Sequence, residues 1–195
     1  MRADGRRRAL FLDRDGVINA DTGYVHRPET FQFTEGIFEL CRAAQAAGYL
    51  LIVVTNQAGI ARGYFSEADF LKLTDWMERR FLEEGVRIQH VYYCPYHPEF
   101  GEGLYKRESP DRKPNPGMLL RAQSDFDLDL ASSFLIGDKL SDFEAARAAG
   151  VGGPILLRSR YLSASLSGSY QPFESLDQIR QQYFKSDKAL DAETM

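Results

Sequence analysis

The segment that most constrains this chain is ALFLDRDGVIN, residues 9–19, where an apolar run ends on two aspartates. Apolar residues up to Leu12 are typical of a central strand in a parallel sheet, and Gly16 suits a tight turn after it. In open α/β sheets, ligands bind at the carboxyl ends of the strands. Because an isolated carboxylate is costly to bury, we expect Asp13 and Asp15 to meet a metal ion, a proton or a cationic group.

The rest of the chain alternates apolar runs with amphipathic segments. The spacing of apolar residues predicts helices after residue 37 and after a capping box at Ser66 and Asp69. Further strands are predicted at residues 49–55, 87–94, 133–136 and 154–157, and further helices after Asn115 (N-cap) and Pro116 (N1), after a second capping box at Ser141 and Glu144, and within 173–183. This alternation predicts an α/β fold, a doubly wound and mostly parallel sheet with helices on both faces.

A length of 195 residues favours one well-buried domain. We expect a single domain over residues 1–160, followed by an extension over residues 161–195 that holds one helix and a frayed tail. Two irregular stretches, residues 20–36 and 95–114, are predicted to be functional loops at the rim of the ligand site.

Composition argues against several classes of partner. A net charge of −4 leaves no basic stripe for a nucleic-acid backbone. Cys41 and Cys94 are too few for a disulfide framework, which favours the reducing cytoplasm. The apolar run near the N-terminus is too short for a signal peptide, and no run approaches the roughly 20 apolar residues of a membrane span. We therefore expect a cytoplasmic monomer with no nucleic-acid or membrane partner.

Polar residues gather at the predicted strand ends: Asp13, Asp15, Thr55, Asn56 and Asp138, with Arg112 and Lys113 nearby. Phosphoryl transfer needs such a set, because it combines a nucleophile, a proton donor, and donors for the charge on the transferring oxygens. Asp13 and Asp138 would repel each other unless a hard divalent cation lay between them. The sequence therefore predicts a Mg²⁺ site.

Four motifs resemble, in their usual order, the signatures of the haloacid dehalogenase superfamily of phosphatases: DRDGVIN, VVTNQAGIARG, RKPNPGM and IGDKLSD. Longer segments resemble the D-glycero-D-manno-heptose 1,7-bisphosphate 7-phosphatases and the related histidinol-phosphate phosphatases: GYVHRPETF, TNQAGIARGYFSEADF, YYCPYHP and RKPNPGMLLRA. The resemblance covers roughly residues 10–157. It implies a Rossmann-like haloacid dehalogenase fold without a large cap domain, and removal of the 7-phosphate from a heptose 1,7-bisphosphate.

The resemblance also implies a role for each matching residue. Asp13 would be the nucleophile and a Mg²⁺ ligand, and Asp138 would complete the metal site. Asp15 would protonate the leaving sugar oxygen, later act as the base for water, and offer Mg²⁺ its backbone carbonyl. Thr55 and Lys113 would hold the transferring phosphoryl group.

Other positions match substrate contacts of the family. Asn56 would assist the phosphoryl site, and Arg112 would recognise the remote phosphate. The remaining matches are Asp21, Thr22, Gly23, Tyr24, Gln57, Ala58 and Lys139.

One family feature is missing from this chain. Family members hold a structural zinc ion with a Cys-x-His pair and a Cys-x-Cys pair, and the corresponding residues here are Cys94, Tyr96, Ser109 and Asp111. Three of the four usual ligands are replaced, and His97 is one residue out of register. We therefore predict that zinc is absent.

Alternatives stay open at this point. Within enzymes, the substrate could be histidinol phosphate or another small metabolite. From a different class, a receiver-like or non-catalytic phospho-binding module also uses clustered acids on such a sheet. Asp142 fits a first-turn position favoured by the helix dipole as well as a place beside the metal. For Tyr24 and His26, loop packing and substrate contact are equally open.

Overall fold

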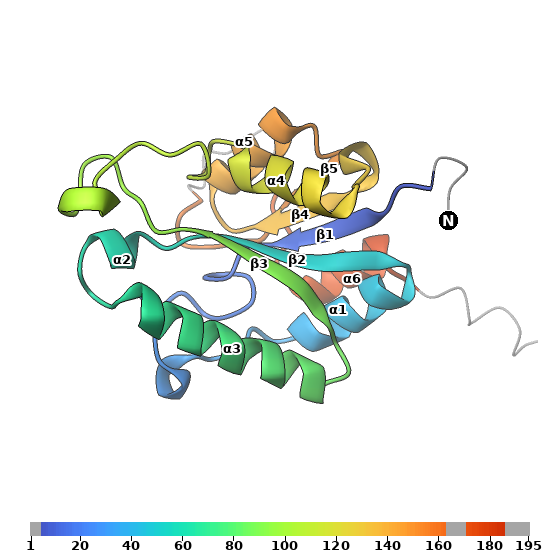
Figure 1. Cartoon of the computed structure of the whole chain (residues 1–195). Coiled ribbons are helices and arrows are strands. Elements are labelled where there is room, and N and C mark those ends of the chain that lie inside the picture. Colours follow the sequence, from blue (N-terminus) through green and yellow to red (C-terminus); the bar gives the residue numbers. More distant parts are fainter. Residues whose placement is uncertain (1–4, 163–170, 186–195) are drawn as a thin grey trace, which may run out of the picture.

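The computed structural model describes residues 5–162 and 171–185. Its centre is a parallel five-stranded sheet in the order β3-β2-β1-β4-β5 (Figure 1). The strands are β1 (Arg8–Leu12), β2 (Tyr49–Asn56), β3 (Ile88–Cys94), β4 (Phe134–Gly137) and β5 (Gly153–Leu156). The strand that carries the two aspartates is therefore central, as the unbroken apolar run predicts.

Helices cover both faces of the sheet (Figure 1). One layer contains α1 (Ile37–Ala46), α3 (Glu67–Glu83) and α6 (Leu176–Tyr183); the other contains α4 (Gly117–Phe126) and α5 (Leu140–Ala149). The short helix α2 (Ala58–Ala61), which the sequence analysis did not predict, follows β2 at the carboxyl ends of the strands. This arrangement confirms the predicted doubly wound α/β fold, and no large cap domain is present in the described residues.

The core lies in two layers, one on each face of the sheet. Leu10 and Leu12 of β1 face the layer of α1, α3 and α6. Ala9 and Phe11 face the layer of α4 and α5, and all four side chains are fully buried. Burial on both faces fixes the end of β1, so the residues that follow it have a defined position.

Local predictions at the helix starts had mixed outcomes. The capping box at α3 is confirmed: Ser66 Oγ accepts from the Asp69 N–H at 3.1 Å, and Asp69 Oδ2 accepts from the Ser66 N–H at 3.1 Å. The predicted box at Ser141 and Glu144 is wrong. Helix α5 begins at Leu140, and the Lys139 N–H donates instead to Asp142 Oδ2 at 3.0 Å.

The predicted start of α4 is also wrong. The helix begins at Gly117, so Pro116 takes the N-cap position. The side chain of Asn115 does not cap the helix but donates from Nδ2 to the Ser109 carbonyl at 2.9 Å. Asn115 thereby ties the start of α4 to the loop before it.

The C-terminal segment joins the main core. The side chain of Ser175 caps α6, accepting from the Gln178 N–H at 3.2 Å. Leu176, Ile179 and Phe184 pack into the same cluster as the buried residues of α1. The predicted frayed tail lies outside the described residues, apart from its first residue. In the described part of the chain, no helix has the length and apolarity needed to cross a membrane.

Candidate active site

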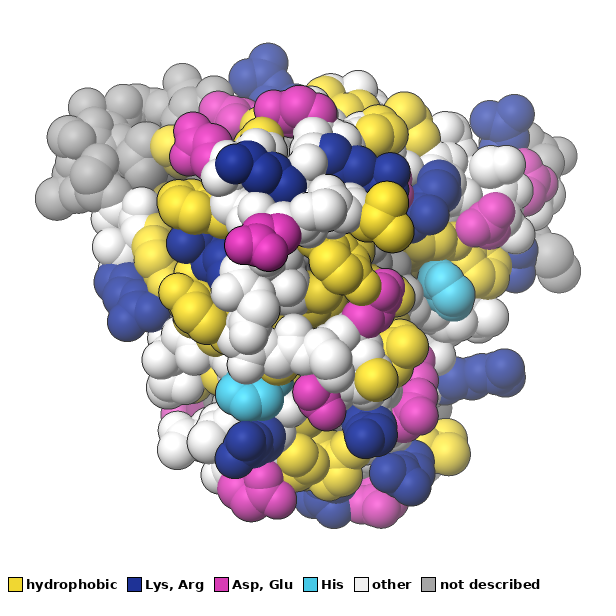
Figure 2. All heavy atoms as spheres, turned by 60° about the vertical axis from the view of Figure 1, so that its left-hand side comes forward, with side chains coloured by type: hydrophobic (Ala, Val, Ile, Leu, Met, Phe, Trp, Pro, Cys, Tyr) yellow, Lys and Arg dark blue, Asp and Glu magenta, His cyan; other side chains and the backbone are white. Residues whose placement is uncertain are grey.

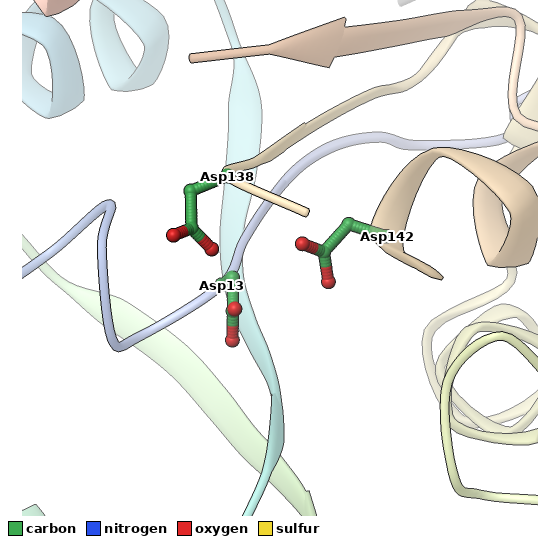
Figure 3. A group of neighbouring side chains, drawn as sticks. All are labelled: Asp13, Asp138 and Asp142. Carbon is green, nitrogen blue, oxygen red and sulfur yellow. The ribbon is translucent and has the colours of Figure 1, made fainter. Parts of the chain in front are cut away.

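Three aspartates converge at the carboxyl ends of the central strands (Figure 3). Asp13 follows β1, Asp138 follows β4, and Asp142 lies in the first turn of α5. Each offers a carboxylate oxygen, and these atoms lie within 4.8 Å of one another. Among residues 5–162 and 171–185, these three side chains form the only group of three or more acidic, histidine or cysteine residues that are close enough together to hold a metal ion. The structure thus brings together Asp13 and Asp138, as predicted, and adds Asp142.

The side chain of Lys113 lies inside this group of carboxylates. Its Nζ is 3.0 Å from Asp13 Oδ1 and 2.6 Å from Asp142 Oδ1, and it donates to the Val54 carbonyl at 2.7 Å. Only 3% of the Lys113 side chain is exposed. Burial opposes the charge, but the two carboxylates outweigh it and raise the pKa of Lys113. The lysine is therefore a fixed positive charge beside Asp13.

The carboxylate of Asp138 is suited to bind a cation because it has no hydrogen-bond donor in the described structure. Both carboxylate oxygens are buried without a hydrogen-bond donor in the described structure, and the nearest cation is Lys139 Nζ, 3.7 Å from Oδ1. Burial, followed by the charge of Asp13, raises the pKa of Asp138 to about 7. A buried carboxylate with no donor is costly, and a hard divalent cation would remove that cost.

The backbone leaves room for the carboxylates only because two neighbours are glycines. A Cβ on Gly16 would lie 2.3 Å from Asp138 Oδ2, and a Cβ on Gly137 would lie 2.2 Å from the Asp142 Cβ. Gly16 also has a φ of +94°, which side chains rarely tolerate. Glycine at these two positions therefore lets Asp138 and Asp142 take the places that they have in the acidic group.

The carboxylate of Asp15 is not part of this group of three and has its own donors. Arg14 Nη2 donates to Oδ1 at 2.8 Å, Asn19 Nδ2 to Oδ1 at 3.1 Å, and Gln57 Nε2 to Oδ2 at 3.0 Å. The two aspartates of the DRD sequence thus occupy different environments. Asp13 faces the lysine and the other carboxylates, whereas Asp15 lines the cavity from a hydrogen-bonded frame.

Residues at the end of β2 hold the other groups in place. Asn56 pairs with the backbone of Lys113: its Nδ2 donates to the Lys113 carbonyl and its Oδ1 accepts from the Lys113 N–H, both at 3.0 Å. Gln57 Nε2 also donates to Thr55 Oγ1 at 3.0 Å. Asn56 therefore positions the lysine, and Gln57 links Thr55 to Asp15.

A cavity of about 350 Å³ opens above these side chains. Of the residues predicted from sequence, its lining includes Asp13, Asp15, Asp21, Gly23, Tyr24, Thr55, Asn56, Gln57, Ala58, Lys113 and Lys139. Three predicted residues are not in the lining: Thr22, which is exposed, Asp138, which is fully buried, and Arg112. The lining also contains residues that were not predicted from sequence: Gly59, Ser141, Arg160 and Tyr161, together with Asp142, whose role was open.

The rim of the cavity contains a polar cluster around Asp21. Asp21 Oδ2 accepts from the Tyr161 hydroxyl at 2.8 Å and lies 3.2 Å from Lys139 Nζ. Arg160 Nη2 lies 3.7 Å from Asp21 Oδ1, and Lys139 Nζ lies 4.4 Å from the centre of the Tyr161 ring. Although burial opposes it, these contacts lower the pKa of Asp21. The segment after β5 therefore forms one wall of the site.

Tyr24 and His26, on the loop after β1, have different surroundings. Tyr24 lines the cavity, and its ring meets the Tyr64 ring edge-on at 4.5 Å. The His26 ring stacks on Phe65 at 5.1 Å and is not in the lining. His26 therefore packs within the loop region, whereas Tyr24 can contact a ligand in the cavity.

Cys94 ends β3, and Arg112 lies with Tyr96, Ser109 and Asp111, the other positions where the family holds zinc, between β3 and α4. Arg112 is partly buried, and its Nη1 donates to the Tyr96 carbonyl at 3.3 Å. Cys94 is fully buried, and burial raises the pKa of its thiol. Ser109 Oγ accepts from the Asp111 N–H at 3.2 Å. Hydrogen bonds within the protein therefore link Ser109 to Asp111 and Arg112 to Tyr96.

Charged side chains of both signs are interspersed on one face of the molecule (Figure 2). On the face shown in Figure 2, basic side chains alternate with acidic and hydrophobic ones. A nucleic-acid backbone favours a continuous basic surface. The face shown in Figure 2 has no such continuous basic surface.

Comparison with known proteins connects this geometry to a family. Residues 111–181 match a family model described as HAD-hydrolase-like. The chain is 63% identical over 155 residues to a D-glycero-alpha-D-manno-heptose-1,7-bisphosphate 7-phosphatase of Burkholderia mallei, covering 80% of this chain and 82% of that protein. It is 56% identical over 151 residues to a D-glycero-beta-D-manno-heptose-1,7-bisphosphate 7-phosphatase of Vibrio cholerae, covering 77% and 81%.

Solved structures agree in fold. A putative HAD-like phosphatase from Mesorhizobium loti has a TM-score of 0.80 and 36% identity, covering 90% of this chain and 84% of that one. The D,D-heptose 1,7-bisphosphate phosphatase from B. bronchiseptica, complexed with magnesium and phosphate, has a TM-score of 0.77 and 30% identity, covering 90% and 97%. These relatives are named as enzymes, which favours an enzyme over a receiver-like module. The chain belongs to the haloacid dehalogenase-like phosphatases, in the branch of the heptose 1,7-bisphosphate 7-phosphatases, and is a phosphoric monoester hydrolase.

Proposed function

We propose that the chain removes the 7-phosphate of D-glycero-D-manno-heptose 1,7-bisphosphate through a covalent aspartyl phosphate on Asp13. The observation that carries this proposal is the position of Asp13, which lies at the floor of the cavity between Lys113 and the buried Asp138. The names of the relatives support the substrate. One relative is named for the α anomer and another for the β anomer, so both anomers belong in the test.

In the first half-reaction, a carboxylate oxygen of Asp13 attacks phosphorus and the bond from phosphorus to the sugar oxygen breaks. The sugar oxygen takes a proton from Asp15, which lines the same cavity. In the second half-reaction, water attacks phosphorus and gives a proton to Asp15. The bond to Asp13 then breaks and inorganic phosphate leaves.

Charge in the cavity supports transfer of an anionic group. Lys113 supplies a fixed positive charge beside Asp13, and Thr55 Oγ1 is held by Gln57. Donors fixed in advance stabilise the transferring oxygens without reorganisation. Asn56 acts through Lys113, whose backbone it holds on both sides.

Mg²⁺ fits the acidic group because the three carboxylates lie close together and the oxygens of Asp138 have no hydrogen-bond donor in the described structure. Asp13 and Asp138 would hold the ion, with Asp142 alongside and the backbone carbonyl of Asp15 as a further ligand. When bound, Mg²⁺ supplies positive charge that offsets the carboxylates and the substrate phosphate. A related solved structure is described as complexed with magnesium and phosphate.

We further propose roles for Arg112 and Thr22. Arg112 recognises the remote phosphate, and Thr22 contributes to the substrate loop. The phosphatase domain spans residues 1–160, and the helix of the extension packs onto the core of that domain. The enzyme acts as a monomer in carbohydrate metabolism in the cytoplasm, where its two cysteines, both free thiols, stay reduced.

A substrate panel with and without Mg²⁺ tests the proposal. It contains both anomers of the heptose bisphosphate, histidinol phosphate and other sugar monophosphates, and phosphorus NMR identifies the position that is cleaved. We expect the heptose bisphosphate to have the highest kcat/KM, with loss of the 7-phosphate only and no turnover in EDTA. A higher kcat/KM for histidinol phosphate or another monophosphate would replace the proposed substrate.

A further inference from the structure

Arg14 lies between the two aspartates in the DRD sequence and has no part in the steps of phosphoryl transfer. Only 1% of its side chain is exposed, which makes it one of the largest fully buried side chains of the described structure. A buried guanidinium is stable only when carboxylates or carbonyls surround it. Its contacts therefore indicate what it does.

Three of these contacts go to the carboxylate of Asp15. Arg14 Nη2 lies 2.8 Å from Oδ1 and 2.9 Å from Oδ2, and Nε lies 3.2 Å from Oδ1. A guanidinium is planar, so several bonds from one guanidinium fix the plane of the carboxylate as well as its distance. Asn19 and Gln57 donate to the same carboxylate from other sides.

A fourth contact links the guanidinium to the loop that follows β1. Arg14 Nη2 also donates to the Val25 carbonyl at 2.7 Å, and the Val25 side chain is 2% exposed. Val25 directly follows Tyr24, which lines the cavity. The Phe70 ring lies beneath the guanidinium, with its centre 5.6 Å from Arg14 Cζ. One buried group thus touches the acid–base carboxylate and the backbone of the substrate loop.

We propose that Arg14 is the positioning residue for Asp15: it orients the Asp15 carboxylate for proton transfer and ties that orientation to the loop that contains Tyr24 and Val25. The inference rests on the proposed function, in which Asp15 is the acid and the base. The Arg14 side chain does not line the cavity and acts through Asp15, while its backbone N–H donates to Asp13 Oδ1 at 2.8 Å.

The leaving group separates a positioning role from a general structural role. A sugar alkoxide needs a proton to leave, whereas p-nitrophenolate leaves without one. Because kcat/KM covers the steps up to departure of the leaving group, the proton from Asp15 affects it only for the sugar substrate. In Arg14→Lys and Arg14→Gln, we expect kcat/KM for the heptose bisphosphate to fall about 100-fold, but at most a few-fold for p-nitrophenyl phosphate.

A second readout follows the base role of Asp15. With p-nitrophenyl phosphate, the Arg14 variants should release a burst of about one equivalent of nitrophenol per chain and then turn over slowly, because water is activated poorly. Wild-type enzyme should show a smaller burst relative to its steady rate. Equal losses on both substrates with no burst would overturn the positioning role and leave Arg14 as a structural residue.

Arg8→Lys is the matched control. Arg8 also donates to a backbone carbonyl, that of Ala47 at 2.9 Å, and stacks on an aromatic ring, that of Tyr49 at 4.3 Å. It lies at the opposite end of β1, so its replacement should leave the ratio of the two kcat/KM values unchanged. A changed ratio in Arg8→Lys would show that loss of an arginine contact away from the site also produces the effect, and the inference would fail.

Asp15→Asn separates this inference from the proposed function. If Asp15→Asn lowers kcat/KM far more for the sugar substrate than for p-nitrophenyl phosphate, the acid role of Asp15 holds and the Arg14 variants test the inference alone. If Asp15→Asn shows no such difference, the proposed function is wrong at this step, whatever Arg14 does.

Discussion

Lys113 Nζ lies 2.6 Å from Asp142 Oδ1, and at most 3% of either side chain is exposed. The other oxygen of Asp142 accepts from the Lys139 N–H at the start of α5. Asp142 therefore connects the lysine beside the nucleophile to a rigid helix. Removing one partner of a buried ion pair is costly, because it leaves the other charge without compensation.

Asp142→Asn tests this connection. The amide keeps the shape of the side chain but removes its charge, so we expect Lys113 to shift and kcat to fall on the order of 100-fold. Calorimetry should show a loss of about 3 kcal/mol in the free energy of unfolding. Asp127→Asn is the control: its carboxylate is 79% exposed and 3.9 Å from Arg6 Nε, so kcat should not change. Wild-type kcat in Asp142→Asn would contradict the account.

Binding of Mg²⁺ should depend on pH through Asp138. Burial, followed by the charge of Asp13, raises the pKa of this carboxyl to about 7 from 3.8. Between those values the folded, metal-free protein holds a proton that the unfolded chain has lost. This group therefore contributes less to stability as pH rises through that window, and Mg²⁺ must displace the proton below about pH 7.

The measurement is the rise in melting temperature when saturating Mg²⁺ replaces EDTA. The rise should be larger at about pH 8 than at about pH 6, because fewer Asp138 carboxyls need to lose a proton at the higher pH. Asp138→Asn should reduce the rise and remove most of its dependence on pH. An equal rise at both pH values in the wild-type protein would argue against this titration.

Tyr161→Phe tests the wall formed by the segment after β5. The change removes the hydroxyl that donates to Asp21 at 2.8 Å and keeps the ring beside Lys139. A hydrogen bond to a charged group contributes about 1.5–3 kcal/mol, and the half-exposed tyrosine places the effect at the lower end. We expect KM to rise about 10-fold with kcat nearly unchanged, as steady-state kinetics can show. A lower kcat with the same KM would instead connect Tyr161 to the chemical step.

Zinc should be absent from the purified protein. Of the four positions that hold zinc in the family, only Cys94 keeps a usual ligand, and burial raises the pKa of its thiol, which disfavours the thiolate that zinc needs. Elemental analysis after dialysis should find much less than one zinc per chain. One equivalent of zinc would show that Cys94, His97 and Asp111 form a rebuilt site.

Much of the fold could be predicted because the sheet is buried on both faces. The apolar run before Asp13 and the helical spacing after residue 37 leave few alternatives, and the structure places both as predicted. Helix starts were harder to predict. At the start of α5, the carboxylate of Asp142 accepts from the Lys139 N–H. The spacing of Ser141 and Glu144 in the sequence does not indicate that contact.

The site could be predicted only in part for a similar reason. Residues that directly follow β1, β2 and β4 come together, as the strand-end rule predicts. Asp142 is four residues after Asp138, on the helix that follows, and its place in the site depends on contacts with Lys113, Asp13 and Asp138 that join distant segments of the chain. Arg160 and Tyr161 follow the edge strand β5, and the same rule extended to that strand would have indicated them.

The central claim is that Asp13 carries the phosphoryl group, and trapping that intermediate tests it most directly. The enzyme is mixed with the heptose bisphosphate and Mg²⁺, quenched in acid and treated with borohydride, which reduces an aspartyl phosphate to homoserine. Peptide mass spectrometry then reads each aspartate. We predict homoserine at position 13 alone, none in the absence of substrate, and no turnover by Asp13→Asn. An unmodified Asp13 in the quenched wild-type enzyme, together with turnover by Asp13→Asn, would contradict the covalent mechanism.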